Sequence, residues 1–357
     1  WTTTPWTLLA NVAIALNPEF QYLFVQTRNF GLVIVVEDLL KPLMKLVSPE
    51  APDDFKVLLK KKGKDLEGLS ARHPFMDRSS QVVLADYVSR TDGTGCVHIA
   101  PGHGADDYRT GLKYKLPVLM PVSEKGIFKE EAGEFKGHHL LKSNEKIIDA
   151  LFQKGHLIHA GQIRHSYPKC WRCKTPVITR ATKQWFMSVD KLDLRKKLLD
   201  AIRKVKWIPE AGQNRISGMI ELRPDWCLSR QRYWGVPVPV FYCSSCDEAL
   251  LNPALIRHIR DQFKKEGSDV WFTRSALELT EGKFPCPKCG RKDLKKGDDI
   301  LDVWFESGAS HIPVLLECAG DALAFPADLY LEGSDQHRGW FQSSLLVSCG
   351  ISGKAPY

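Results

Sequence analysis

The first part of the chain contains a succession of short β-type stretches. Apolar and β-branched residues fill 21–26 and 32–36, and the residues between them, Arg28-Asn29-Phe30-Gly31, favour a hairpin turn. Similar stretches lie at 82–88, 116–122 and, punctuated by glycines, 126–137. Short irregular strands with long loops are typical of a closed or nearly closed barrel rather than of alternating strands and helices. We interpret the basic stretch 56–64 as a solvated loop.

Helical spacing of apolar residues is clearest over 190–206. Leu194, Leu198, Ile202 and Val205 form one stripe, basic residues lie largely on the other side, and Pro209 ends the pattern. Four further helices are expected at 37–47, broken or shortened by Pro42, at 143–155, at 252–264 and at 340–349.

Strand-like stretches accompany the helices in the second half of the chain, at 236–242, 300–305 and 328–332. The order of strand, turn and helix over 328–349 favours a parallel α/β sheet, in which ligands bind beyond the carboxyl ends of the strands. The pattern therefore predicts an α/β multidomain protein whose first part is β-rich.

Length and composition are compatible with this picture. A chain of 357 residues is long enough for two or three domains, and 43% hydrophobic and 26% charged residues are ordinary for a globular protein. No apolar run reaches the length of a membrane span, and no signal peptide is recognisable, so we expect a cytoplasmic protein without membrane contact. The formal charge of +8 suits a polyanionic partner without requiring one.

Six of the ten cysteines form three C-x-x-C pairs. Two of these pairs, Cys243-Cys246 and Cys286-Cys289, together provide four thiolates, enough for a closed tetrahedral Zn²⁺ site with a structural role; four free thiols are the alternative. The third pair, Cys170-Cys173, has no second pair left in the chain and predicts only half of a site.

Polar residues cluster in two stretches, Thr91–Tyr108 (TDGTGCVHIAPGHGADDY) and Trp1–Thr7 (WTTTPWT). The first brings imidazoles and carboxylates to a point where a strand gives way to a glycine-rich turn, which permits close approach of a ligand. A solvated turn and an ordinary threonine-rich strand edge are the alternatives.

Together these stretches closely resemble the editing pocket of class I isoleucyl-tRNA synthetases. The resemblance continues through YPKCWRCKTPVITRATKQWF (167–186), RPDWCLSRQRYWGVPVPV (223–240), DVWFESG (302–308) and YLEGSDQHRGWFQSSLL (330–346). The chain contains no H-I-G-H-type or K-M-S-K-S-type segment. We therefore expect the middle of a larger protein.

The resemblance implies a β-barrel-like editing domain inserted in a Rossmann-type class I synthetase catalytic domain. The editing domain would cover 1–165. A connecting segment with a C-x-x-C knuckle and a basic helix would cover 166–222, and the second half of the catalytic domain would cover 223–357. A small zinc lobe would occupy about 241–299 of that half.

The resemblance also implies an activity and its residues. The full enzyme, expected to be a monomer, would attach isoleucine to tRNA(Ile) with ATP and Mg²⁺ and hydrolyse valyl-tRNA(Ile) in the editing pocket. In that pocket Asp107 would hold the α-ammonium group, His98 would form the size-selective wall, and Thr2, Thr3 and Thr4 would position the ester, the terminal adenosine or the water. The aminoacyl-adenylate contacts carried over are Glu332, Gly333, Asp335 and Gln336.

Other interpretations are compatible with the sequence. The chain could be a free-standing editing hydrolase, although such a protein would not need 223–357, or a zinc-stapled tRNA-binding module without catalysis. In any of these, the basic stretch 56–64 and the basic face of 190–206 are minor candidates for contact with tRNA; a solvated face is the more common use of such residues.

Overall fold

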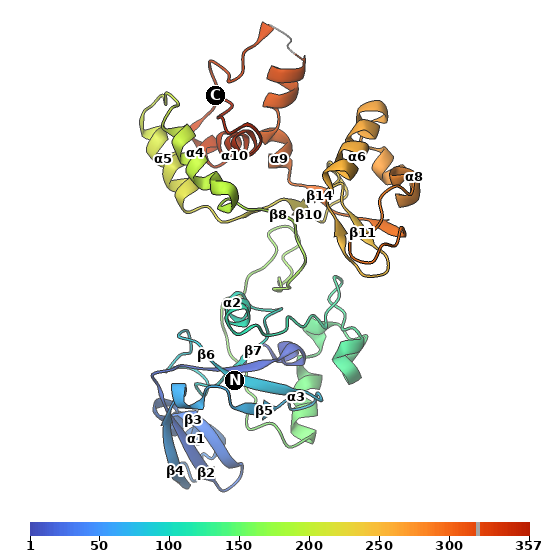
Figure 1. Ribbon diagram of the computed structural model, residues 1–357. Coiled ribbons are helices and arrows are strands. Elements are labelled where there is room, and N and C mark those ends of the chain that lie inside the picture. The colour runs from blue at the N-terminus through green and yellow to red at the C-terminus, as the bar shows by residue number, and fades with distance from the viewer. Residues whose placement is uncertain (319–321) are drawn as a thin grey trace. The chain divides into compact units, whose positions relative to one another are not determined.

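The computed structural model describes residues 1–318 and 322–357 and has mixed α/β content, as predicted. The chain forms two compact units, Trp1–Thr182 and Lys183–Tyr357, which are described separately (Figure 1). None of the described helices is both long and apolar enough to cross a membrane.

A four-stranded sheet forms the centre of the first unit, in the order β5-β6-β1-β7. Its strands are β1 (Ala13–Leu16), β5 (Ser70–Arg72), β6 (Ser79–Leu84) and β7 (Val97–Ile99). β1 is parallel to β6 and antiparallel to β7. Small and β-branched residues of these strands, among them Ala13, Val83 and Ile99, are fully buried, so the strands pack closely beside the threonine-rich segment.

A second sheet has the order β3-β2-β4, with β2 (Gln21–Thr27), β3 (Gly31–Val36) and β4 (Phe55–Lys62). The predicted hairpin is confirmed, with Phe24 opposite Ile34. The interpretation of 56–64 as a loop is wrong: β4 pairs with β2 along its length, and a register shift between Phe24 and Val25 breaks the alternation that would have identified it. Helix α1 (Glu37–Val47) covers one face with Leu39, Leu40 and Met44, and runs on through Pro42.

The strands of the first unit form two separate sheets among the described residues, so the expected barrel closure is wrong. Isolated bridges at Val122–Phe128 and Ile127–His139 replace the strands expected within 116–137. Positive φ angles at Gly126 and Gly133 interrupt an extended chain there. The remaining elements are η1 (Pro5–Ala10), η2 (Gly63–Leu66), α2 (Ala105–Tyr114), η3 (Glu130–Phe135), η4 (Leu140–Lys142) and α3 (Asn144–Gln153).

The second unit has a helical core and a small lobe. The core contains β8 (Phe186–Met187), η5 (Lys191–Asp193), α4 (Leu194–Ile202), α5 (Ala211–Glu221), β9 (Trp226–Cys227), β10 (Ser229–Arg230), β14 (Ile300–Leu301), α9 (Val303–Gly308), the π-helix η6 (Ile312–Cys318), η8 (Ser334–His337) and α10 (Trp340–Ser352). The lobe contains β11 (Phe241–Cys243), β12 (Ala249–Leu250), α6 (Pro253–Glu266), α7 (Val270–Thr273), α8 (Ala276–Thr280) and β13 (Leu294–Lys296).

The parallel sheet expected in the second half is not present among its described residues, where every ladder is antiparallel. Only Ile300–Leu301 of the expected strand 300–305 is extended, because Asp302 caps α9 directly afterwards. The expected strand 328–332 pairs with no strand in the part of the chain that the structure describes, and Leu329 and Leu331 are 75% and 79% exposed. A parallel strand gains stability from neighbours on both sides and helices on both faces.

The amphipathic stretch 190–206 forms α4, preceded by η5, and buries Leu194, Leu198 and Ile202 as predicted. The helix ends at Ile202, well before Pro209, and the next helix, α5, was not predicted. Helix α4 packs against α5 and α10, whose Leu345 and Leu346 are fully buried.

Replacing Leu198 by Ala removes a fully buried side chain from this core. We expect the free energy of unfolding of the second unit to fall by about 2–5 kcal/mol. Hydrogen exchange of the α4 and α10 amides measures this loss. Leu222→Ala is the control, because Leu222 is 87% exposed; equal protection in both variants would contradict this packing.

Candidate functional sites

The threonine-rich segment pairs with β7. The main-chain nitrogen of Trp1 donates to the Cys96 carbonyl oxygen at 2.9 Å, and the His98 amide donates to the Trp1 oxygen at 3.3 Å. The ring of Trp1 lies against Gly93, whose φ is +73° and where a Cβ would lie 2.4 Å from a ring carbon. Glycine is therefore required at this turn, and Thr2–Thr4 follow directly beside His98.

The imidazole of His98 is held at both nitrogens. Nδ1 lies 3.2 Å from Asn11 Nδ2, and Nε2 lies 2.8 Å from Thr7 Oγ1. Because Thr7 Oγ1 donates its own proton to the Thr4 carbonyl at 2.7 Å, it accepts one from Nε2, and Nδ1 accepts from the Asn11 amide. One tautomer of a neutral imidazole satisfies every partner.

Asn11 is fixed by two strands. Its Nδ2 also donates to the Ala13 oxygen of β1 at 2.9 Å, and its Oδ1 accepts from the Ser80 hydroxyl of β6. A single hydrogen-bonded chain thus runs from Ser80 through Asn11, His98 and Thr7 to the Thr4 carbonyl. Burial lowers the pKa of His98 to about 3, so the ring is neutral at pH 7.

Asp107 lies in the first turn of α2, and its Oδ2 accepts from the Ala100 amide at 2.8 Å. A Cβ at Gly104 would lie 3.0 Å from the Asp107 carboxyl carbon, so glycine permits this close packing. Burial raises the pKa of Asp107 despite that hydrogen bond. Within the described residues, Oδ1 has no hydrogen bond to another residue, which leaves it available to a cation.

Two side chains hold the end of η1 that leads to Asn11. His73 Nε2 lies 2.8 Å from the Leu8 oxygen, and Arg78 donates to the Leu9 and Asn11 oxygens. These donors reach carbonyl oxygens at the helix end, where intrahelical donors run out; the Leu8 oxygen also accepts from the Asn11 amide at 3.0 Å. Burial lowers the pKa of His73 to about 4.

The structure brings His98, Asp107 and the threonine segment to the end of β7. Thr2 Oγ1 accepts from the Thr4 amide at 3.0 Å, while the Thr3 side chain is exposed. Thr7 could have been selected from the WTTTPWT stretch. Asn11 follows η1 in an apolar stretch and Ser80 lies in β6, and no sequence motif marks either residue.

The cysteines of the lobe form the second site. The sulfurs of Cys243, Cys246, Cys286 and Cys289 all lie within 4.8 Å of one another, with Cys243–Cys289 at 3.5 Å and Cys246–Cys286 and Cys246–Cys289 at 3.6 Å. Tetrahedral zinc with Zn–S bonds of about 2.3 Å separates its sulfurs by about 3.8 Å. The four thiols therefore fit one Zn²⁺ without rearrangement, and no position is left for a catalytic water.

The third pair has the same backbone turn as the other two. The amide of the first cysteine donates to the carbonyl oxygen five residues on (Cys170 to Thr175, Cys243 to Glu248, Cys286 to Arg291). The amide of the residue after the second cysteine donates to the carbonyl oxygen of the first cysteine. That residue has a positive φ in all three turns: Lys174, Asp247 and Gly290. Among the described residues no other ligand group joins Cys170 and Cys173, so the half-site stays a prediction.

The predicted adenylate contacts lie on and before a single 3-10 turn, η8. Glu332, Gly333 and Asp335 are exposed. Gln336 Nε2 donates to Asp335 Oδ2 at 3.0 Å, and its Oε1 accepts from the Trp340 amide at 2.8 Å, at the start of α10. Gln336 therefore joins this turn to the core helix.

Asp302 links two of the sequence motifs and was not singled out from the sequence. It is 6% exposed, and its Oδ2 accepts from Arg230 at 2.7 Å and from the Trp226 indole at 2.9 Å. Its Oδ1 caps α9 at the Trp304 amide. The residue thus fixes the RPDWCLSRQ segment against DVWFESG.

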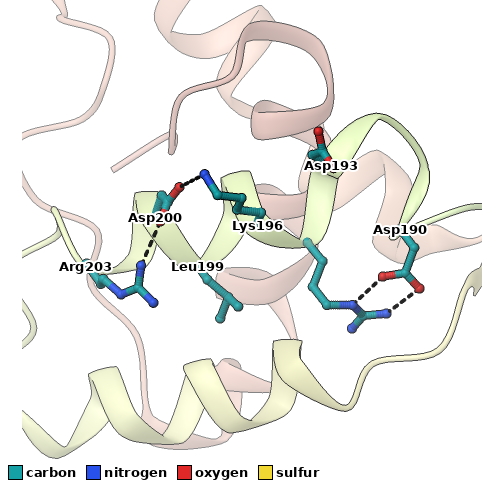
Figure 2. A pocket seen from close by; sticks show the side chains of 7 residues that line it. Asp190, Asp193, Lys196, Leu199, Asp200 and Arg203 are labelled. Carbon is teal, nitrogen blue, oxygen red and sulfur yellow. Dashed lines mark hydrogen bonds and ion pairs between the residues drawn. The ribbon is translucent and has the colours of Figure 1, made fainter.

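A hollow of about 390 Å³ lies over the polar face of α4 (Figure 2). Its charged groups pair with one another: Arg195 with Asp190, and Asp200 with both Lys196 and Arg203. Five of the six charged side chains that line the hollow are therefore paired with one another, and Asp193 is the sixth.

Comparison with known proteins places the whole chain. The family model for tRNA synthetases class I (I, L, M and V) matches residues 1–357. The chain belongs to the class I tRNA synthetases. Its similar relatives include isoleucine–tRNA ligases of Kosmotoga olearia, Moorella thermoacetica and Thermotoga maritima, at 53%, 50% and 52% identity.

These alignments cover 100% of this chain and 38% of each of the three relatives. These isoleucine–tRNA ligase relatives agree with the family resemblance that the sequence motifs indicate. A solved structure described as "The crystal structure of GlLeuRS-CP1" overlaps 46% of this chain and 83% of its own, with a TM-score of 0.37 and 16% identity.

The four-cysteine group predicts about one zinc per chain. Cys286→Ser removes a buried ligand, so we expect zinc content to drop well below one per chain and hydrogen exchange to increase in the lobe while the first unit keeps its protection. Elemental analysis measures the metal. Cys349→Ser is the control, because Cys349 packs in the helical core, and wild-type protein without zinc would contradict the site.

Acid should destabilise the first unit. In the unfolded chain His98 and His73 bind a proton with the ordinary histidine pKa of 6.5. In the folded unit the pKa is lowered to about 3 for His98 and to about 4 for His73. The free energy of unfolding therefore falls as the pH is lowered from about 6.5 towards 4.

Denaturant titrations at pH 7 and pH 5 measure this dependence. His98→Gln should be less stable than the wild type at pH 7 but should lose less stability on acidification. His159→Gln serves as the control, because His159 is exposed. An unchanged pH dependence in His98→Gln would contradict a buried neutral imidazole.

Proposed function

We propose that the chain is the central part of an isoleucine–tRNA ligase and that residues 1–165 hydrolyse valyl-tRNA(Ile). The full enzyme would charge tRNA(Ile) with isoleucine at the expense of ATP, with Mg²⁺ as the nucleotide's counterion, as a cytoplasmic monomer. Residues 166–222 would connect this editing domain to the second half of the catalytic domain at 223–357. Relatives at 50–53% identity support the family assignment.

A second, hydrolytic pocket is needed because binding alone discriminates poorly between isoleucine and valine. One methylene contributes only about 1–3 kcal/mol to discrimination, and isoleucyl-tRNA synthetases are the standard example of that limit. A pocket that admits the smaller valyl group and excludes the isoleucyl group removes the product that binding alone cannot reject.

The observation that carries this proposal is the hydrogen bonding of His98. With both ring nitrogens occupied by Thr7 and Asn11, the imidazole has no free nitrogen for proton transfer, and its low pKa keeps it uncharged. A rigid, neutral ring is suited to act as a wall that excludes the larger side chain.

The other residues have complementary roles. Asp107 is anchored through Oδ2 and would bind the substrate's α-ammonium group through Oδ1. The hydroxyls of Thr2, Thr3 and Thr4 would position the ester, the terminal adenosine and the attacking water. Because both ring nitrogens of His98 are occupied, water held by these hydroxyls and the substrate's ribose is the proposed nucleophile.

The remaining sites belong to the charging reaction. Glu332, Gly333, Asp335 and Gln336 would contact the aminoacyl-adenylate, and the Cys243, Cys246, Cys286 and Cys289 zinc would stabilise its lobe. Cys170 and Cys173 would contribute two ligands to a second metal. The second unit, which an independent editing hydrolase would not need, favours the ligase over that alternative.

Asp107→Asn tests the charge at that position. The amide oxygen can still accept from the Ala100 amide, so the fold is preserved while the attraction to the ammonium group is lost. We expect deacylation of valyl-tRNA(Ile) to fall by at least about 10-fold, since hydrogen bonds to charged groups contribute about 1.5–3 kcal/mol. Asp106→Asn is the control, because Asp106 is exposed and pairs with Arg109; equal activity in both variants would refute the role.

His98→Ala tests the wall. Removing the ring should keep hydrolysis of valyl-tRNA(Ile) and begin hydrolysis of isoleucyl-tRNA(Ile), because the obstacle to the larger side chain is gone. Single-turnover deacylation of both charged tRNAs measures the change. A folded variant that leaves isoleucyl-tRNA(Ile) intact would show that His98 only supports the strand.

A further inference from the structure

The segment after α3 has an unusual charge. Residues 150–182 contain six Lys or Arg and no Asp or Glu, against +8 for the whole chain. One of the six forms an ion pair, Lys154 with Glu134, and two donate to carbonyl oxygens, Arg180 to Val122 and Lys174 to Trp171. Among the described residues, no carboxylate lies within ion-pair distance of Lys169, Arg172 or Lys174.

At the tip of this segment a tryptophan is displayed to solvent. Trp171 is 75% exposed, although it lies in the tight turn between Cys170 and Cys173. The Arg172 guanidinium carbon stands 4.7 Å from the centroid of its indole. One face of the ring is therefore covered by a cation, and the other is available to a planar group.

The turn that carries Trp171 is held by its own backbone. The Cys170 amide donates to the Thr175 oxygen at 2.8 Å, and the Lys174 amide donates to the Cys170 oxygen at 2.8 Å. The Lys174 ammonium also donates to the Trp171 carbonyl at 2.6 Å, and a bridge joins Lys169 to Pro176. The ring is thus presented from a defined turn and loses little freedom on binding.

We propose that the 169–174 knuckle is a platform for single-stranded RNA, in which one unpaired base stacks on Trp171 and the phosphates beside it contact Lys169, Arg172 and Lys174. An exposed aromatic ring flanked by unpaired cations is the combination that binds unpaired nucleotides, because every base has a stacking face and every linkage a charge. A duplex hides its base faces, and an acidic peptide has no requirement for the ring.

Under the proposed function, the single strand that binds here would be the unpaired 3′ end of a charged tRNA. Only this identification of the strand rests on the proposed function. In that case the knuckle would hold the 3′ end, while the hydrolysis itself takes place at the end of β7.

Fluorescence anisotropy with a labelled single-stranded oligoribonucleotide of about six residues tests the platform on the full chain. Trp171→Ala should weaken binding by about 5- to 100-fold, the range measured for one stacked base, and Trp171→Phe should retain most of it. Phe152→Ala, which removes another exposed aromatic side chain (68%), should leave binding unchanged. Equal affinity of Trp171→Ala and wild type would overturn the proposal.

Salt and strand state give independent readouts. The Lys169→Gln, Lys174→Gln double variant should reduce the slope of log affinity against log salt by about 1.4, since each phosphate contact to a single strand contributes about 0.7. A duplex of the same sequence should bind more weakly than the single strand. Binding of the duplex as tight as that of the single strand would overturn the stacking mode.

Deacylation separates this proposal from the editing function. Trp171→Ala should raise the KM for valyl-tRNA(Ile) with little change in kcat, whereas Asp107→Asn should reduce deacylation without altering oligonucleotide binding. If Asp107→Asn retains full activity while Trp171→Ala loses RNA affinity, the editing function fails and the platform stands. If RNA affinity is unchanged in Trp171→Ala while Asp107→Asn is inactive, the platform alone fails.

Discussion

The geometry at the end of β7 depends on burying one neutral imidazole with both nitrogens satisfied. A buried polar group left without a partner costs about 1–3 kcal/mol, so His98 requires Thr7 on one side and Asn11 on the other. Asn11 in turn requires Ser80 and the Ala13 carbonyl. Three strands and the segment before η1 are therefore fixed together, and the Thr4 carbonyl at the end of this chain cannot move independently of β6. Hydrogen-bonded networks of this kind lose more than one bond when any member is removed.

A similar constraint organises the second unit. Asp302 is buried and accepts hydrogen bonds from the Arg230 guanidinium, the Trp226 indole and the Trp304 main-chain amide. A buried ion pair contributes little net stability, but removing one partner leaves the other charge buried without compensation. Asp302 therefore determines where Arg230 and Trp226 lie, even though the ion pair adds little to the free energy of unfolding. In both units a buried polar side chain holds the sequence motifs in place: Asn11 in the first unit and Asp302 in the second. Neither residue was singled out from the sequence.

This explains which features could be predicted from the sequence. Local signals predicted the hairpin of β2 and β3, the helix α6, and the four-cysteine group. Two elements were missed: β4 is hidden by a register shift in its pairing with β2, and α5 by Gly212 and Gly218 in a short helix with few apolar residues. Asn11 was missed because its role depends on where β6 and β7 lie in space. The strand expected at 328–332 was wrong because its Leu329 and Leu331 side chains, apolar as in a buried strand, are exposed and pair with no neighbouring strand among the described residues.

The distribution of charge connects the fold to the partner. A formal charge of +8 says little by itself, because part of the most regular basic surface, at α4, is paired internally: Arg195 with Asp190, and Lys196 and Arg203 with Asp200. Residues 150–182 contribute six positive charges and no negative ones, and the knuckle within them keeps three cations unpaired beside an exposed indole. Holding like charges together without counterions costs free energy in the isolated protein, and a polyanion recovers it on binding. An attraction confined to one short turn can orient a flexible strand, whereas the same charge spread evenly over the surface could only attract it.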